Sequence, residues 1–365
     1  MPDQIHRKIG QLVIVGFDGT SIPSDLQAIA REMGLGGVVL FDRNIESPEQ
    51  VGELAYETLT LSRELLPPWV SVDQEGGRVA RLRSPFTQWP AMSSLGRGVD
   101  TELAARFAHA MARELKAVGV TLDYAPVLDV NTNPENVVIG DRALSGEPEV
   151  VGKLGEAIVD SLQVVGVAAC AKHFPGHGDT SEDSHLELPL VAHSTNRLRA
   201  VEFHPFRVAI ARDVAAVMTA HVLYSSLDEV RPATLSHHIL TGILREELGF
   251  EGLIISDDME MAAISDGYSI EDATVQAIGA GCDMVLLCGV DIDKQGRVLE
   301  ALIHGVEDGR LKRERIEESF TRQEQVKARF LSDIREWRPL GTGQLRKLLG
   351  CDDHFSIAQE MERFL

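Results

Sequence analysis

Cysteine is scarce in this 365-residue sequence, and membrane-length apolar runs are missing. The four cysteines contain no CxxC pair, and two of them lie inside apolar runs, where reduced thiols pack as small hydrophobic groups. They are Cys170, Cys282, Cys288 and Cys351. We therefore expect no disulfide framework, and the lack of a long apolar stretch argues against a membrane-spanning protein.

Clustered positive charge is also missing. Lysine and arginine total 35 residues against 56 aspartates and glutamates, which gives a formal net charge of −21. Nucleic acids and anionic membrane surfaces are bound by clustered Lys and Arg, so neither is an expected partner. The first residues enter a strand-like run without the basic segment, apolar core and cleavage site of a secretion signal, and this predicts a cytoplasmic location.

Short β-branched runs bounded by Gly, Pro or Asp recur at eight places along the chain. They cover residues 12–17, 36–41, 68–73, 121–130, 166–174, 215–221, 252–258 and 283–288. Longer segments with helical spacing lie between them, among them residues 100–119, 197–213 and 269–281. Eight strand–helix units in about 290 residues favour a single (β/α)₈ TIM-type barrel over an open doubly wound sheet. The first strand also lacks a GxGxxG turn, which weakens the dinucleotide-binding alternative.

The predicted domain organisation is one barrel domain with a short C-terminal helical extension. We assign residues 1–335 to the barrel, and residues 336–365 to an extension that begins as a linker and continues as helix. Its role is not evident from the sequence.

Polar residues collect where five of the eight strands end. The motifs are VDQEGGR (72–78), LDVN (128–131), AKHFPGHG (171–178), MTAH (218–221) and ISDD (255–258). In a parallel barrel the carboxyl ends of the strands converge on one rim, where the active sites of this architecture lie. We therefore expect these distant motifs to share one cleft.

Asp257 and Asp258 end the seventh strand. A carboxylate at the end of an apolar strand is partly desolvated, so it needs cationic or amide partners. Asp258 suits the N-cap of the helical stretch that follows, which leaves Asp257 free for chemistry. The structural alternative is that Asp257 itself provides the cap.

The DSH motif holds Asp183 and His185, two residues apart. On an extended segment both could lie on one side, where the carboxylate would fix one imidazole tautomer and raise its basicity. A solvated pair on a turn is the alternative. Lys172 and His173 end the fifth strand, so one should face the barrel axis and the other the helices, unless the chain bends there.

Other charged residues of these motifs have simple structural interpretations. A buried Lys172 needs an acid or a polar ligand such as a sugar hydroxyl. His177 and His221 are interpreted as structural histidines with satisfied hydrogen bonds. Asp73, Arg81 and Arg142 could be ordinary ion pairs at the rim, where such pairs contribute little to stability. These residues alone leave several functions open.

Taken together, the motifs resemble a known enzyme family. From about residue 8 to about residue 290, the strings GQLVIVGFDG, GGVVLFDRN, VDQEGGRVARL, YAPVLDVN, IGDRALSG, KHFPGHGDTSEDSHLELP and GFEGLIISDDMEM occur in order. They resemble the β-N-acetylglucosaminidases of glycoside hydrolase family 3, of the type that recycles peptidoglycan. The KHFPGHGDT...DSH string is the most specific of them.

The resemblance implies a barrel and a retaining double displacement without metal or organic cofactor. Asp257 matches the nucleophile and His185 the acid–base, supported by Asp183 on a loop after the fifth strand. The sugar-binding positions of the family fall on Asp73, Arg81, Arg142, Lys172 and His173. Larger two-domain relatives take their acid from a second domain, which this sequence does not contain, so the DSH pair is the expected proton-transfer group.

The implied function is an exo-acting β-N-acetylglucosaminidase on soluble peptidoglycan fragments, with N-acetylglucosamine-containing muropeptides as its small carbohydrate substrates. A neutral imidazole base would also tolerate an anionic acceptor, so a phosphorylase on the same pair is an alternative, as is a broader β-glycosidase. The oligomeric state is left open.

Two rivals from other classes are weaker. A metal-dependent barrel hydrolase could use His173, His177, His185 and Asp257 as ligands, but no HxH pair closes an early strand and each ligand already has a role in the non-metal mechanism. A catalytically silent sugar-binding barrel would be expected to lack a member of the catalytic set, whereas Asp257, Asp183 and His185 are all present.

Overall fold

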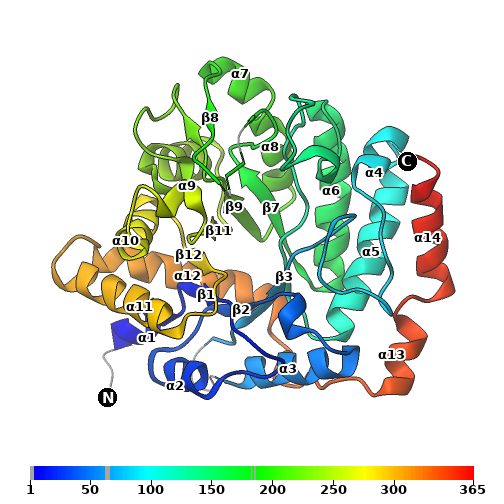
Figure 1. Cartoon of the computed structure of the whole chain (residues 1–365), viewed down its shortest axis with the longest axis horizontal. Coiled ribbons are helices and arrows are strands. Elements are labelled where there is room, and N and C mark those ends of the chain that lie inside the picture. Colours follow the sequence, from blue (N-terminus) through cyan, green and yellow to red (C-terminus); the bar gives the residue numbers. More distant parts are fainter. Residues whose placement is uncertain (1–3, 62–65, 182, 185) are drawn as a thin grey trace.

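Eight parallel strands close into a barrel at the centre of the molecule (Figure 1). This computed structural model describes residues 4–61, 66–181, 183, 184 and 186–365. The barrel strands are β1 (Val13–Val15), β2 (Gly37–Leu40), β3 (Trp69–Val72), β6 (Leu122–Asp123), β7 (Ala168–Phe174), β9 (Ala216–Thr219), β11 (Leu253–Asp258) and β12 (Met284–Leu287). Each pairs in parallel with the next barrel strand along the chain, and β12 pairs with β1. The predicted (β/α)₈ fold is confirmed.

Helices surround the barrel. The longer ones are α2 (Ser24–Met33), α3 (Pro48–Thr60), α5 (Thr101–Ala117), α6 (Pro148–Val165), α8 (Phe203–Ala211), the π-helix η4 (His238–Glu247), α10 (Ile270–Ala280), α11 (Ile292–Glu307) and α12 (Arg313–Phe330). Capping side chains fix several of their starts: the Asp100 carboxylate, for example, accepts hydrogen bonds from the backbone N–H groups of Glu102 and Leu103. Short elements complete the shell: α1 (Gln4–Gly10), η1 (Asp42–Asn44), α4 (Ser93–Gly98), η2 (Gly140–Arg142), α7 (Thr195–Ala200), η3 (Ala233–Leu235) and α9 (Ala262–Ser265).

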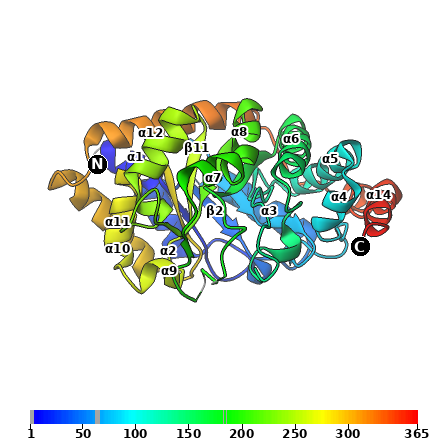
Figure 2. The same ribbon diagram turned by 90° about the horizontal axis from the view of Figure 1, so that it is seen from above.

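The strands are apolar on both faces because each face packs against a core. Inward-facing side chains such as Ile14, Val39, Cys170 and Ile255 fill the barrel, whereas outward-facing ones join the larger core under the helices. Val326 and Leu331 of the α12 region pack against the inner core. Figure 2 shows α12 along the upper edge of the molecule and α9 at the lower edge. The barrel interior is therefore a packed core, covered at its amino end by α12.

Two predicted segments differ from the structure. Residues 197–213 form two helices, α7 and α8, instead of one. Pro205, in the first turn of α8, has no N–H to bond the carbonyl of Val201, so a continuous helix cannot pass this point. The run 121–130 has only β6 as a strand. Pro126 has no N–H to donate to the ladder, and beyond it Val127 forms an isolated parallel bridge with Lys172.

The C-terminal residues form α13 (Thr342–Leu348) and α14 (Asp352–Glu362), which lie beside α5 (Figure 1). The His354 Nδ1 is 2.8 Å from a carboxylate oxygen of Glu114 in α5, and the backbone N–H of Gly350 donates to the same oxygen. The helical extension is thus present, while the boundary at residue 335 stays a prediction. Among the described residues no helix is both long and apolar enough to span a bilayer, and the cytoplasmic location also stays a prediction.

Candidate active site

The carboxyl ends of the strands surround a cavity of about 330 Å³. Four of the five predicted motifs contribute to its wall, through residues such as Asp73, Lys172, Met218 and Asp257. The chain after β3 folds back as an antiparallel hairpin of β4 (Gln74–Gly76) and β5 (Val79–Ala80), which sets Asp73, Glu75 and Arg81 around one side. The LDVN motif lies behind this wall instead of in it.

Lys172 is the buried cation of the cavity. Its side chain is 2% exposed, and its Nζ lies 2.8 Å from an oxygen of Asp73 and 2.6 Å from an oxygen of Glu75. Burial opposes the charge, but Asp73 and Glu75 together hold the pKa of Lys172 above its usual range. Lys172 is therefore a permanent cation that fixes the Asp73 carboxylate.

Glu75 links Lys172 to Arg142. The Nε and one terminal nitrogen of Arg142 bind the two Glu75 oxygens at 2.9 and 2.7 Å, a bidentate pair. Although burial alone would raise the pKa of Glu75, Arg142 and Lys172 hold it well below the usual range. Arg81 lies 3.6 Å from the other Asp73 oxygen. The predicted rim ion pairs are thus a connected network, with Glu75 at its buried centre.

His173 is held by Asp129 of the LDVN motif. One oxygen of the fully buried Asp129 lies 2.7 Å from Nδ1 of His173, and the other accepts the backbone N–H groups of His173 and His177. A carboxylate at Nδ1 favours the tautomer with its proton there, which leaves Nε2 as an acceptor for the cavity. The strand pairing shifts register between Ala171 and Phe174, so Lys172 and His173 both line the cavity instead of facing opposite ways.

Asp257 lines the cavity from the end of β11. Its Oδ1 accepts the backbone N–H of Asp258 at 2.8 Å. Burial alone would raise the pKa of Asp257, but His173, His221, this N–H group and Lys172 together bring it below the usual value. An ionised carboxylate at this place can act as a nucleophile or stabilise developing positive charge.

Asp258 does not cap the following helix, contrary to the prediction. Its Oδ1 accepts the backbone N–H groups of Glu260 and Cys288, and α9 begins only at Ala262, after Met261. Burial, with the nearby charges of Glu260 and Asp257, raises the pKa of Asp258 to about 6. Asp258 therefore ties the ends of β11 and β12 together.

The DSH segment reaches the same cavity. Ser184 is buried and lines the wall, its Oγ lies 3.0 Å from Nε2 of His177, and its carbonyl accepts the N–H of Ala263. The Asp183 carbonyl accepts the N–H groups of Leu186 and Glu187. The placement of Asp183 and His185 on one side of an extended segment stays a prediction. His185, the predicted acid–base, lies outside the described residues.

His177 and His221 make the contacts of structural histidines. The Nδ1 of His177 lies 2.8 Å from the Thr180 hydroxyl, and burial lowers the pKa of His177 to about 4, so the ring is neutral near pH 7. The Nδ1 of His221 lies 2.7 Å from the Thr234 hydroxyl, and its Nε2 lies 2.9 Å from the carbonyl of Asp258. His177 thereby connects Ser184 to the loop that carries Asp129.

Within the described part of the chain, no group of three or more His, Cys, Asp or Glu side chains is arranged to hold a metal ion. His185, one of the four ligands of the metal-dependent alternative, is outside that part. The described residues provide instead charged donors and acceptors for a neutral, hydroxyl-rich ligand.

Two important residues were missed by sequence reasoning. Glu75 stands inside the VDQEGGR motif, and its signal is the glycine pair after it: Gly76 and Gly77 both have positive φ, which permits the tight hairpin that buries the carboxylate. Asp129 ends an apolar run as Asp257 does, so the same desolvation argument would have identified it.

Comparisons with known proteins place this barrel among the glycoside hydrolases. Residues 4–326 match the family model described as the glycosyl hydrolase family 3 N-terminal domain. Because this match covers most of the sequence, the chain belongs to glycoside hydrolase family 3.

Its relatives by sequence carry related names. A "Beta-hexosaminidase" of Alkalilimnicola ehrlichii is 41% identical over 282 residues, covering 76% of this chain and 80% of that protein. "Beta-hexosaminidase A" of Pseudoalteromonas piscicida is 35% identical over 335 residues, covering 85% of this chain. This chain spans only 56% of the latter relative's length.

Solved structures agree. A family 3 β-N-acetylglucosaminidase from Paenibacillus sp. superposes with a TM-score of 0.94 at 41% identity, covering 98% of this chain and 68% of that one. NagZ of Neisseria gonorrhoeae, solved with N-trifluoroacetyl-D-glucosamine, superposes with a TM-score of 0.77 at 30% identity, covering 97% of both chains.

Proposed function

We propose that the protein is a retaining exo-β-N-acetylglucosaminidase that removes terminal N-acetylglucosamine from soluble peptidoglycan fragments. The observation that supports this most is the meeting of three features in one cavity. These are the Asp257 carboxylate, Ser184 of the DSH segment, and the charged network of Asp73, Lys172 and Arg142. The names of the family 3 relatives favour N-acetylhexosamine as the substrate class.

In the proposed mechanism the sugar ring is bound by the charged network. Asp73 accepts hydrogen bonds from ring hydroxyls. Lys172, Arg81 and Arg142 donate to the remaining polar groups, and His173 accepts through its Nε2. Because these side chains are already paired and partly buried, they need little reorganisation when the sugar binds.

Bond cleavage follows in two steps. Asp257 attacks the anomeric carbon while the His185 imidazolium protonates the departing oxygen, giving a glycosyl ester and a neutral imidazole. Water then attacks the anomeric carbon and gives a proton to His185, and the bond from this carbon to the Asp257 oxygen breaks, which frees the Asp257 carboxylate. Asp183 supports the imidazole as its hydrogen-bond partner. An imidazole suits this place because, unlike a second carboxylate, it adds no negative charge beside Asp257.

Trapping the intermediate tests the proposal. A 5-fluoro N-acetylglucosaminide should inactivate the enzyme over time, and mass spectrometry of the digest should find the label on Asp257. Asp257→Asn should abolish labelling, whereas Asp258→Asn, which keeps an acceptor for Glu260 and Cys288, should still be labelled at Asp257. A label on Asp258, or an unlabelled protein that still turns over substrate, would refute the assignment.

A further inference from the structure

Ser184, the middle residue of the DSH segment, is held at two points. Its Oγ lies 3.0 Å from Nε2 of His177, and its backbone carbonyl accepts the N–H of Ala263 at 3.3 Å. Ser184 is 2% exposed, although it lines the cavity of the candidate active site. Ala263 belongs to α9, which follows the strand that carries Asp257. Ser184 therefore joins the loop after β7 to the loop after β11.

His177, the partner of the Ser184 hydroxyl, is held by a chain of buried hydrogen bonds. Its Nδ1 lies 2.8 Å from the hydroxyl of Thr180, which also donates to the His177 carbonyl. The Nδ2 of Asn136 donates to the same carbonyl at 2.8 Å and to the Thr180 hydroxyl at 3.2 Å. These three residues and Ser184 are each 3% exposed or less. The chain of bonds thus runs from Asn136 to the DSH segment, with every member shielded from water.

The acceptors in this chain determine where its protons lie. The Thr180 hydroxyl has one proton, and that proton goes to the His177 carbonyl, because a carbonyl can only accept. The Nδ1 of His177 must then donate to Thr180, which leaves Nε2 as the acceptor of the Ser184 hydroxyl. Burial lowers the pKa of His177 to about 4, so the ring is neutral near pH 7 and Nε2 keeps its lone pair.

His177 is also fixed to the sugar-binding side of the cavity. Its backbone N–H donates to one oxygen of Asp129 at 2.6 Å, and the other oxygen of Asp129 holds His173. The rings of His173 and His177 meet edge to face, with their centroids 6.0 Å apart. His177 therefore lies between a side chain of the sugar cavity and the hydroxyl of Ser184, where it sets the distance between the two.

We propose that His177 is a positioning residue for the proton-transfer step and that it acts through Ser184. This inference rests on the proposed function, in which His185 protonates the departing oxygen. His185 follows Ser184 directly in the chain, so the place of Ser184 limits where the proton donor can be. A misplacement of about 1 Å can cost about 100-fold in rate. In this role neither His177 nor Ser184 touches a reacting atom.

Two substrates with different leaving groups test this role. Ser184→Ala should lower kcat/KM for an N-acetylglucosaminyl disaccharide by about 10-fold or more, because its alkoxide leaving group needs the proton. For the 2,4-dinitrophenyl N-acetylglucosaminide, whose leaving group needs none, the loss should be less than about threefold. His177→Leu should give the same split. His177→Gln should recover part of the loss, because its amide oxygen can accept from Ser184.

The double variant of Ser184→Ala with His177→Leu tests whether His177 acts through Ser184. Both changes break the same hydrogen bond, so the disaccharide loss of the double variant should be no larger than that of the more affected single variant. Losses that multiply would show that the two residues act separately, and this would overturn the proposal.

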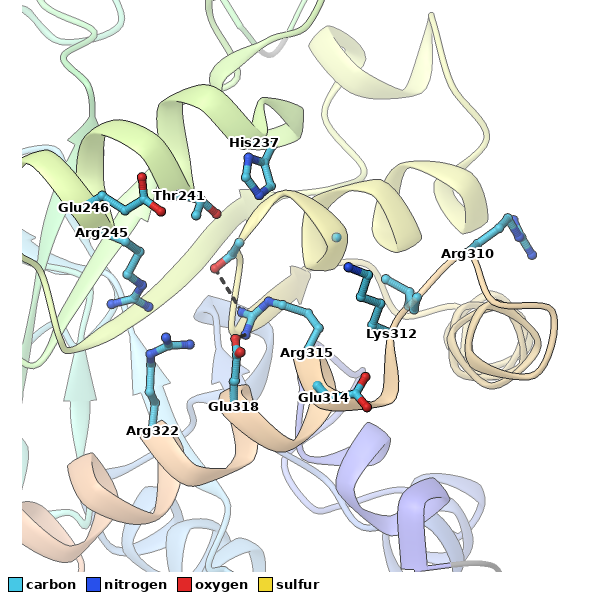
Figure 3. Close-up of a pocket in the computed structure, with 13 residues that line it drawn as sticks. His237, Thr241, Arg245, Glu246, Arg310, Lys312, Glu314, Arg315, Glu318 and Arg322 are labelled. Carbon is cyan, nitrogen blue, oxygen red and sulfur yellow. Dashed lines mark hydrogen bonds and ion pairs between the residues drawn. The ribbon is translucent and has the colours of Figure 1, made fainter.

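The matched control removes a buried serine hydroxyl at the other end of the barrel. Ser319 of α12 is fully buried, and its Oγ donates to Asp283, which directly precedes β12. Figure 3 shows this end of the barrel, where Arg315 and Glu318 of α12 line a separate cavity. Ser319→Ala should lower the midpoint of urea unfolding and leave kcat/KM unchanged for both substrates. Ser184→Ala should instead change the ratio of the two kcat/KM values.

His185→Ala, measured beside these variants, separates the two ways of failing. If His185→Ala slows the disaccharide selectively and Ser184→Ala slows both substrates equally, only the positioning role is wrong. If His185→Ala itself slows both substrates equally, the proposed acid–base is wrong, and the positioning role is wrong as well.

Discussion

Glu75 is the buried anion that joins two cations of the candidate active site. It is 1% exposed and receives Arg142 and Lys172 together. The ionised form of a buried carboxylate is strongly favoured when it neutralises two cations. Removing its charge leaves both cations without that partner. Glu75 touches no reacting atom in the proposed mechanism, so it is a positioning residue.

We predict that Glu75→Gln lowers kcat/KM by about 100-fold and the free energy of unfolding by about 3–5 kcal/mol. The physical reason is that Lys172 and Arg142 lose the anion that orients them toward the sugar. Steady-state kinetics and urea unfolding measure the two effects. Glu114→Gln, at a buried carboxylate remote from the cavity, should lower stability and leave KM unchanged. If Glu75→Gln behaves like that control, the positioning role is wrong.

His185→Ala should affect substrates according to their leaving groups. An aryl leaving group such as 2,4-dinitrophenolate departs without protonation, whereas a sugar alkoxide needs a proton in the transition state. We expect a loss of about 10²–10⁴-fold for a disaccharide substrate and a much smaller loss for the activated aryl glycoside. Parallel slowing of both substrates would exclude His185 as the proton donor.

Among the elements, α12 contains an unusual buried cation. Lys327 is 2% exposed, and its Nζ donates to the side-chain carbonyl of Gln11 and the backbone carbonyl of Gly36 at 3.0 and 3.1 Å. Burial lowers the pKa of Lys327 to about 7. In the unfolded chain the same lysine titrates near 10.4.

The sign of the resulting pH dependence follows from proton counting. Between about pH 7 and 10.4 the unfolded chain binds more protons, so the free energy of unfolding rises with pH, and this stabilisation is absent below about pH 7. As the pH falls from 9 to 6, we predict that the wild type loses on the order of 2 kcal/mol of unfolding free energy relative to the Lys327→Met variant. Urea unfolding at both pH values measures it. A difference that does not change with pH would mean that Lys327 stays charged in the folded protein.

The sequence predicted the secondary-structure elements correctly where the periodicity of the apolar residues and the positions of the turn residues agreed. All eight barrel strands fall within the predicted runs, because strands apolar on both faces leave a strong local signal. The helix predicted over 197–213 failed where Pro205 interrupts it, although the apolar spacing continues across the break. The missing N–H of the proline therefore decided where the helix breaks, although the periodicity of the apolar residues predicted one continuous helix.

Site residues were predictable to the extent that they end strands. Asp73, Lys172 and Asp257 reach one cavity because parallel strands end on one rim. Partner choice was not predictable: nothing local in the sequence indicates that Arg142 pairs with Glu75 or that Asp129 orients His173. Those pairs join residues about 40 to 70 positions apart and depend on the closed barrel.

At the scale of the whole molecule, the C-terminal helices are attached to the barrel shell. Met361 in α14 is fully buried. We predict that Met361→Ala lowers the free energy of unfolding by about 2–5 kcal/mol while kcat stays unchanged, because the cavity it creates is remote from the candidate active site. Tryptophan fluorescence and residual activity, followed in the same urea series, should give one shared transition. Separate midpoints would show that residues 336–365 unfold as an independent unit.

Lys172 and Glu75, both buried, line the cavity between the strand ends, and its volume of about 330 Å³ is that of a small-molecule site. Under the proposed exo action, a glycan is bound there by its terminal residue. Each catalytic event would shorten the polymer by a single ring, so the viscosity of a long-chain solution should fall far more slowly than free reducing sugar accumulates.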